Sequence, residues 1–132
     1  MNKNKDICLE WVAKADEDLR SLESLLKHKE GSPSTGCFLA QQAVEKLFKS
    51  LLVLHGAELE KVHDLIVLLN KIKIYQPEIE RFLDKILVLT RYYIETRYPG
   101  DYPEFTWEEC KRAFNTAAEI VEFVKESVFK FA

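Results

Sequence analysis

The chain has little glycine and proline, with four residues of each among 132. These residues supply most tight turns, so we expect few connections and long elements. Such a composition favours helices over a many-stranded sheet. Cysteine is also scarce: Cys8, Cys37 and Cys110 are odd in number, widely spaced and outside any CxxC motif. This pattern predicts reduced, buried thiols rather than a disulfide framework.

The chain lacks a long apolar run and an excess of basic charge. No stretch approaches the ~20 apolar residues of a membrane span, and the polar first six residues do not resemble a signal peptide. The net charge of −3 argues against a protein that coats nucleic acid by bulk electrostatics, but it permits a local basic site. No spaced His, Cys and Asp cluster predicts a metal site. We expect a soluble, cytoplasmic protein without membrane contact, metal or cofactor.

What the chain does contain is apolar periodicity. Its length fits one domain, residues 1–132, with a sizeable core. Apolar side chains recur at steps of three and four, and no segment alternates as a strand would. The first predicted helix follows an Asp6 cap, and the second spans 35–55 and ends at Gly56. The third, a short helix, spans 65–72 after an Asp64 cap, and the fourth begins at Pro77. The fifth follows a Thr106–Glu109 capping box. The predicted fold is all-α: an up-and-down bundle of four long helices and one short helix.

A charged stripe crosses the apolar second helix. Gln42, Glu45, Lys46 and Lys49 stand at i, i+3, i+4 and i+7, which places them on one narrow face beside Gln41. One interpretation is a solvated face with a Glu45–Lys49 pair worth ~0.2–0.5 kcal/mol. The other is a groove or subunit contact, where the amides bond across the contact and the lysines meet an anionic group.

A second polar group follows the fourth predicted helix. Residues 90–99 hold Arg91, Arg97 and three tyrosines, among them Tyr98. The planar guanidinium of arginine can form bidentate hydrogen bonds to phosphate, and the tyrosine ring can stack on a base. The same residues also suit a structural role, because a cation stabilises the last turn of a helix. His63, directly before the predicted cap Asp64, has the same two interpretations: packing residue or site residue.

Taken in order, these segments resemble the HEPN family, the nucleotide-binding domains of prokaryotes and higher eukaryotes. The resemblance rests on Trp11 with Asp18-Leu19, Gln41-Gln42-Ala43-Val44-Glu45-Lys46 with Lys49, His63-Asp64-Leu65, Arg97-Tyr98-Pro99 and an Ala- and Val-rich last helix. It implies a helical bundle that tends to dimerise and is often encoded beside a minimal nucleotidyltransferase, as a two-component pair of the toxin–antitoxin kind. Many relatives are metal-independent ribonucleases with an Arg-x4–6-His motif.

The chain departs from that motif. None of its three histidines, His28, His55 and His63, follows an arginine by four to six residues. Six residues after Arg91 stands Arg97, and an arginine cannot act as a base because its pKa exceeds ~12. We therefore expect no catalytic residues. The predicted nucleotide- or phosphate-binding residues are Arg91, Arg97, Tyr98, Lys46 and Lys49; the predicted interface or groove residues are Gln41, Gln42, Glu45, His63 and Asp64.

The expected function is a binding and assembly module. It would be a homodimer that binds a nucleotide or RNA and acts with a minimal nucleotidyltransferase partner. The alternative is a metal-independent ribonuclease toxin, which would have to take its base from elsewhere, with His63 the only candidate. A third interpretation is that the site is vestigial and only the dimer matters.

Overall fold

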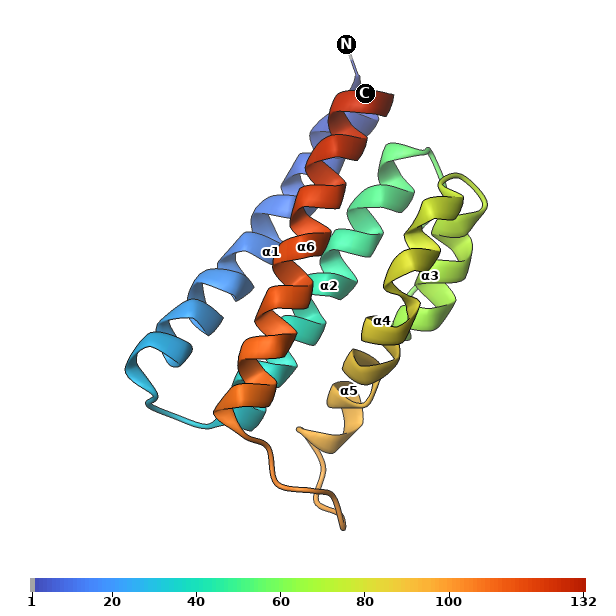
Figure 1. The fold of residues 1–132 in the computed structure, drawn as a ribbon. Helices are drawn as coiled ribbons and strands as arrows, with labels where there is room; N and C mark the ends of the chain where they lie inside the picture. The colour runs from blue at the N-terminus through green and yellow to red at the C-terminus, as the bar shows by residue number, and fades with distance from the viewer. Residues whose placement is uncertain (1) are drawn as a thin grey trace.

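The computed structural model describes residues 2–132, so Met1 of the predicted domain lies outside the described residues. These residues form helices and contain no strand (Figure 1). The elements are α1 (Lys3–His28), α2 (Pro33–Leu54), α3 (Leu65–Lys73), the 3-10 helix η1 (Pro77–Phe82), α4 (Leu83–Thr90), α5 (Tyr92–Glu95) and α6 (Trp107–Phe131). The predicted all-α bundle is confirmed.

Two helices begin earlier than predicted. Asn2 caps α1, because its side chain accepts a hydrogen bond from the backbone N–H of Lys5 at 3.0 Å, and Asp6 already lies inside the helix. Ser32 caps α2, and Pro33 occupies its first turn. A proline is well suited to that position, since its missing N–H would have no helical partner there. The Ser-Pro pair thus starts a helix rather than extending the turn before it.

The other predicted caps are confirmed. The Asp64 carboxylate accepts hydrogen bonds from the backbone of α3, the nearer from Ile66 N at 2.9 Å. The Thr106 hydroxyl accepts from Glu109 N at 3.1 Å. Gly56 has a φ of +77° directly after the end of α2, in the left-handed region that favours glycine. Each of these caps depends only on residues close in sequence.

The fourth predicted long helix is divided into η1, α4 and α5. Pro77 begins η1, as the sequence predicts for a first helical turn. Two threonine hydroxyls bond backward to backbone carbonyls: Thr90 to Leu87 at 2.8 Å, and Thr96 to Tyr92. Such bonds compete with the regular helical ladder. They lie at the end of α4 and at the end of α5, where the helical run is interrupted.

Helix α2 lies at the centre of the bundle and contacts every other α-helix (Figure 1). α1 and α2 run in opposite directions, and α6 packs against both. The connection 55–64 returns along α2, because His63 reaches Glu45 in the middle of that helix. α3 then runs in the same direction as α2, and Tyr75 beyond its end stacks on His55 at 4.9 Å. This extended return places His63 beside the charged stripe.

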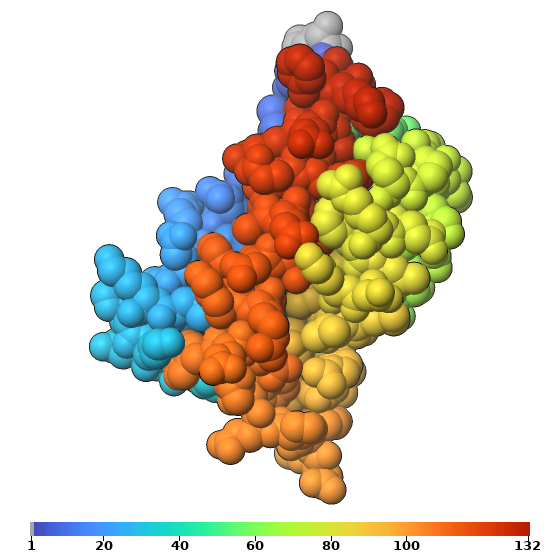
Figure 2. Space-filling view, in the orientation of Figure 1, coloured from blue at the N-terminus to red at the C-terminus, as the bar shows by residue number. Residues whose placement is uncertain are grey.

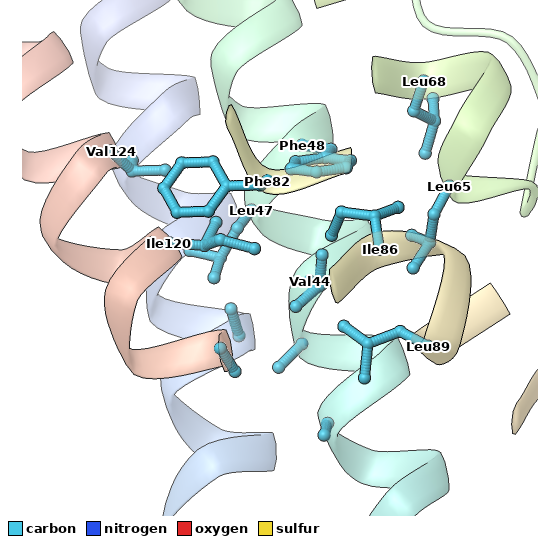
Figure 3. Packing of buried hydrophobic residues seen from close by; sticks show 14 of the residues in the cluster. Val44, Leu47, Phe48, Leu65, Leu68, Phe82, Ile86, Leu89, Ile120 and Val124 are labelled. Atoms are coloured by element: carbon cyan, nitrogen blue, oxygen red, sulfur yellow. The ribbon is translucent and has the colours of Figure 1, made fainter. Parts of the chain in front are cut away.

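The apolar core lies around α2, which packs against α1, α6 and the pair α3 and α4. Figure 3 shows Val44, Leu47 and Phe48 of α2 between the side chains of α6 and those of α3 and α4. The surrounding core residues labelled there are Leu65, Leu68, Phe82, Ile86, Leu89, Ile120 and Val124. All three cysteines are free and buried, as predicted. Figure 2 shows α6 crossing the visible face between α1 and the α3–α4 side. Across residues 2–132, we find no helix with the length and apolarity of a membrane span.

Candidate functional site

The charged stripe of α2 is covered by the rest of the chain. Gln41 is fully buried, Glu45 retains 5% of its exposure and Lys49 retains 9%. The solvated-face interpretation therefore does not hold for these three residues. Burying polar and charged groups is costly unless they are paired. Their hydrogen bonds consequently decide what the stripe does.

Two stripe residues find their partners inside the chain. The Lys46 ammonium lies 2.6 Å from the Asp18 carboxylate of α1, and both side chains are partly buried. The side-chain Nε2 of Gln42 donates a hydrogen bond to the side-chain Oε1 of Gln41 at 2.6 Å. Lys46 therefore joins α2 to α1, and Gln42 bonds to its own neighbour.

Glu45 is the hub of the stripe. Its Oε2 accepts hydrogen bonds from the Lys49 ammonium at 3.1 Å and from Nδ1 of His63 at 3.0 Å. The Lys49 ammonium also lies 5.6 Å from the centre of the Trp11 ring, a cation–π distance. The other Glu45 oxygen, Oε1, and the Gln41 Nε2 are buried without a hydrogen-bond partner in this structure. The buried Glu45 carboxylate thus forms a hydrogen bond with the exposed His63 imidazole.

The phenol ring of Tyr93 contacts both His63 and Arg97. The His63 ring stacks on Tyr93, with centroids 5.1 Å apart and planes 17° apart. The Arg97 guanidinium carbon lies 4.4 Å from the Tyr93 ring centre and 5.7 Å from that of Phe38. Its Nη2 donates to the Tyr98 hydroxyl at 3.2 Å. A hydrogen bond to Tyr93 raises the pKa of Arg97, so the guanidinium stays charged.

No acid neutralises that guanidinium among the described residues. Within residues 2–132, no carboxylate oxygen lies within 4.0 Å of an Arg97 nitrogen. Arg97 is exposed, and it is held in place by aromatic rings rather than by an opposite charge. This is the state in which a guanidinium is available to an external anion.

His63 lines two hollows. The first measures about 400 Å³ and includes Trp11 and Lys49 in its lining. The second measures about 290 Å³ and includes Tyr93 and Ile94. We name the set of Glu45, Lys49, His63, Tyr93 and Arg97 the His63 groove; Arg97 lines neither hollow and belongs to the set through its contact with the Tyr93 ring. In residues 2–132 no three His, Cys, Asp or Glu side chains are grouped as metal ligands.

Arg91 lies apart from the His63 groove. Its guanidinium bonds to Glu109 of α6 at 3.3 Å and lies 3.7 Å from Glu95. It lines a separate hollow of about 540 Å³ between α4 and α6, together with Arg112. The structure thus does not bring Arg91 and Arg97 to one phosphate. Asp64, another predicted groove residue, caps α3 and also lines the second hollow at His63.

Sequence reasoning singled out neither Tyr93 nor Phe38 as site residues. A signal for Tyr93 existed, since it precedes Arg97 by four residues, the spacing of neighbours on one helical face. Phe38 precedes Gln42 by four residues, and Trp11 belongs to the family resemblance, but neither position links the residue to Arg97 or Lys49. Phe38 and Trp11 come from α2 and α1, and only the packing of the bundle places them at the groove.

Comparison with known proteins gives one sequence match and two structural matches. The HEPN domain profile matches residues 8–127. The crystal structure of ST0689, an archaeal HEPN homologue, is similar with a TM-score of 0.72 and 28% identity, covering 97% of this chain and 99% of that one. The crystal structure of TT1696 from Thermus thermophilus is similar with a TM-score of 0.75 and 32% identity, covering 96% of this chain and 98% of that one. No curated protein matches at comparable significance.

Proposed function

Because the chain belongs to the HEPN domain family, we propose that it is a nucleotide- or phosphate-binding and assembly module without catalytic activity. It acts as a homodimer with a minimal nucleotidyltransferase partner, in a two-component system of the toxin–antitoxin kind. The ligand-binding part of this proposal is located in the His63 groove. The dimer is located on the outer face of α4 and α5.

The observation that carries the proposal is the state of Arg97. A guanidinium that is exposed, oriented by rings and free of acidic neighbours is suited to a bidentate contact with phosphate. Tyr98 is half exposed beside it and offers a ring for a base to stack on. Lys46 and Lys49 are left out of the proposed ligand contacts, since Asp18 and Glu45 already neutralise them.

The dimer proposal is supported by apolar side chains that no other part of the chain covers. Leu87, Val88 and Ile94 retain 49%, 48% and 47% of their exposure on α4 and α5. Leu87 and Ile94 are seven residues apart, and Arg91 stands between them at i+4. Three large apolar residues on so short a run are typical of a face that meets a partner.

Nucleotide titration tests the ligand-binding proposal. Isothermal calorimetry with nucleoside monophosphates and with inorganic phosphate should show binding by the native chain. Arg97→Ala should weaken that binding by about tenfold to a hundredfold, because one charged hydrogen-bonding contact is worth roughly 1.5–3 kcal/mol. Arg20→Ala, on the exposed face of α1, is the matched control and should bind as the native chain does. Unchanged affinity in Arg97→Ala would contradict the assignment.

The partner proposal has its own test. Co-expression of the chain with the nucleotidyltransferase encoded beside it, where such a gene lies there, should yield a complex in size-exclusion chromatography. Separate elution of the two proteins would overturn this part and leave the ligand site unaffected.

A second candidate function, metal-independent RNA cleavage, is favoured by one specific contact. The Glu45–His63 hydrogen bond resembles the carboxylate–imidazole pairs that orient a general base. Incubation with RNA and a chelator distinguishes the two functions. Cleavage that disappears in His63→Ala and persists in His28→Ala would favour the enzyme over the binding module.

A further inference from the structure

We propose that the hollow between α4 and α6 binds a small monoanionic amphiphile, a molecule with one carboxylate head group and an apolar body. The hollow lies along the seam between these helices, which Figure 2 shows on the visible face. It measures about 540 Å³, within the range of sites that enclose small molecules. No residue of the His63 groove lines it, so this second site is independent of the proposed nucleotide site.

The hollow is bounded at both ends by side chains that reach across to α6. At one end the Lys85 ammonium lies 2.8 Å from both carboxylate oxygens of Glu119. At the other end Arg91 and Tyr92 bond to the Glu109 carboxylate, Tyr92 at 2.8 Å. Glu109 and Glu119 stand ten residues apart on α6, which is about 15 Å along a helix. A long strand running through the hollow would have to break these bonds, whereas a small molecule fits between them.

Between the two ends the hollow is lined by apolar side chains. Leu89 and Ala113 are buried against the core, and Val88 is half exposed on the α4 side. Both α4 and α6 pack against α2, so the core of the bundle closes the inner side of the hollow. A ligand that covered Val88 would remove apolar surface from water, which strengthens binding by up to about fourfold per buried CH₂ group.

The hollow contains one cation that no acid of the chain neutralises. Within residues 2–132, no carboxylate oxygen lies within 4.0 Å of a side-chain nitrogen of Arg112. The two acids of the lining already have cationic partners, Glu109 in Arg91 and Glu119 in Lys85. The lining therefore carries one uncompensated positive charge, which matches a ligand with a single negative charge.

The neighbours of Arg112 indicate how the head group is bound. A guanidinium forms bidentate hydrogen bonds with a carboxylate. Asn115 stands three residues further along α6 and lines the same hollow, so its amide lies on the same helical face and can donate to the head group as well. The apolar body then extends past Val88 toward the Lys85–Glu119 end.

A second copy of the chain is the competing occupant of the hollow. Val88 belongs to the apolar face proposed for the dimer, whereas Leu87 and Ile94 of that face do not line the hollow. The hollow thus lies beside the proposed contact and shares one residue with it. The uncompensated charge favours the small anion, because an apolar contact between copies leaves Arg112 without a partner.

Calorimetry with three matched ligands tests the inference on the full chain. Octanoate carries the head group and the apolar body, 1-octanol lacks the charge, and butyrate lacks four CH₂ groups. We expect octanoate to bind, and 1-octanol to bind about tenfold to a hundredfold more weakly, the effect of one charged hydrogen-bonding contact. Butyrate should bind more weakly than octanoate by a similar factor, because less apolar surface is buried.

Three variants assign the binding to the hollow. Arg112→Gln should weaken octanoate binding by about tenfold or more and leave 1-octanol within about twofold, because only the head group loses a contact. Lys111→Gln removes the adjacent exposed cation, which does not line the hollow, and should bind both ligands as the native chain does. Asn115→Trp places a large ring in the hollow from an exposed position and should weaken both ligands.

The outcomes that would overturn the inference are specific. Equal affinity for octanoate and 1-octanol, or equal affinity of Arg112→Gln and the native chain for octanoate, would remove the head-group contact. Octanoate binding by Leu87→Glu but not by the native chain would assign the hollow to a second copy.

The failures of the two proposals are distinguishable, since they concern different ligands and different residues. Absence of heat with octanoate would overturn this inference and leave the proposed function standing. Absence of heat with nucleoside monophosphates would overturn the proposed function and leave the hollow between α4 and α6 as a binding site.

Discussion

The Lys46 ammonium lies 2.6 Å from the Asp18 carboxylate, and this contact ties α2 to α1 across the bundle. Lys46→Met should therefore act on stability. We expect the free energy of unfolding to fall by about 1–3 kcal/mol, between the cost of losing an exposed pair and the cost of breaking a buried one. Urea denaturation measures this. Lys14→Met, which removes an exposed Lys14–Glu17 pair, should cost less than about 0.5 kcal/mol.

The same variant checks the assignment of the ligand contacts. Affinity of Lys46→Met for nucleoside monophosphates should stay within about twofold of native, as no free charge is removed. A tenfold loss of affinity without loss of stability would show that Lys46 leaves Asp18 to meet the ligand.

The raised pKa of Tyr92 predicts how the stability of the fold changes at high pH. Burial, and then the hydrogen bond to Glu109 at 2.8 Å, raise the pKa of Tyr92 above its usual value of about 10. The unfolded chain therefore releases this proton first as pH rises. The stabilisation is complete below pH ~10 and is lost as pH rises through the folded-state pKa, by up to about 1.4 kcal/mol per pH unit.

Comparison with Tyr92→Phe isolates that contribution, because the other titrating groups are shared. The stability advantage of the native chain over Tyr92→Phe should shrink between pH 9 and pH 11, as measured by urea denaturation at each pH. An advantage that stays constant or grows over this range would contradict the role of the phenol. Tyr102→Phe, at an exposed tyrosine of the loop before α6, serves as the control.

At Gly36, α2 and α6 pack too closely to leave room for a side chain. A Cβ at this position would overlap Cys110 Sγ and stand 3.1 Å from Leu22 Cδ1. Gly36→Ala should therefore destabilise the fold by about 1–3 kcal/mol, the usual cost of overpacking a core. Combining it with Cys110→Ala should restore about 1 kcal/mol or more in a double-mutant cycle. Strictly additive effects would show that Cys110 is not the obstacle.

The apolar face of α4 and α5 predicts the behaviour of the proposed dimer. Leu87→Glu places a charge in that face, and sedimentation should then show a species of one chain mass where the native chain shows two. Leu9→Glu, at an exposed leucine of α1, is the matched control and should sediment as the native chain does. A native chain that sediments as a monomer at every concentration would rule out the dimer itself.

The features that sequence predicted well depend on short-range chemistry. Asp64 and Thr106 cap helices through atoms two or three residues away, so their roles follow from local pattern. The Glu45–His63 contact joins residues 18 apart, and it depends on a connection that returns along α2. No periodicity in the sequence encodes that return path. The fold class was therefore accessible from the sequence, and the groove was not.

The two arginines illustrate the remaining difference. Arg91 lies at the break between α4 and α5, and Arg97 lies beyond the end of α5, so no single helix carries both side chains. Arg91 accordingly faces α6 and Glu109, and Arg97 faces Phe38 of α2. Proximity in sequence suggested a shared phosphate, but the interruption of the helical run separates the two side chains. Tyr93, four residues before Arg97, lies against it together with Phe38 and Tyr98.

His63 of the groove and Asp64, which caps α3, are adjacent in sequence. We therefore expect fraying of the first turn of α3 to draw His63 away from Glu45, so that the helix and the groove open together. By linkage, a ligand that binds His63 also holds this turn closed. Hydrogen exchange at the amides of Ile66 and Val67 should consequently slow when the groove is filled, although neither residue lines it. The start of α3 would then report occupancy from outside the site.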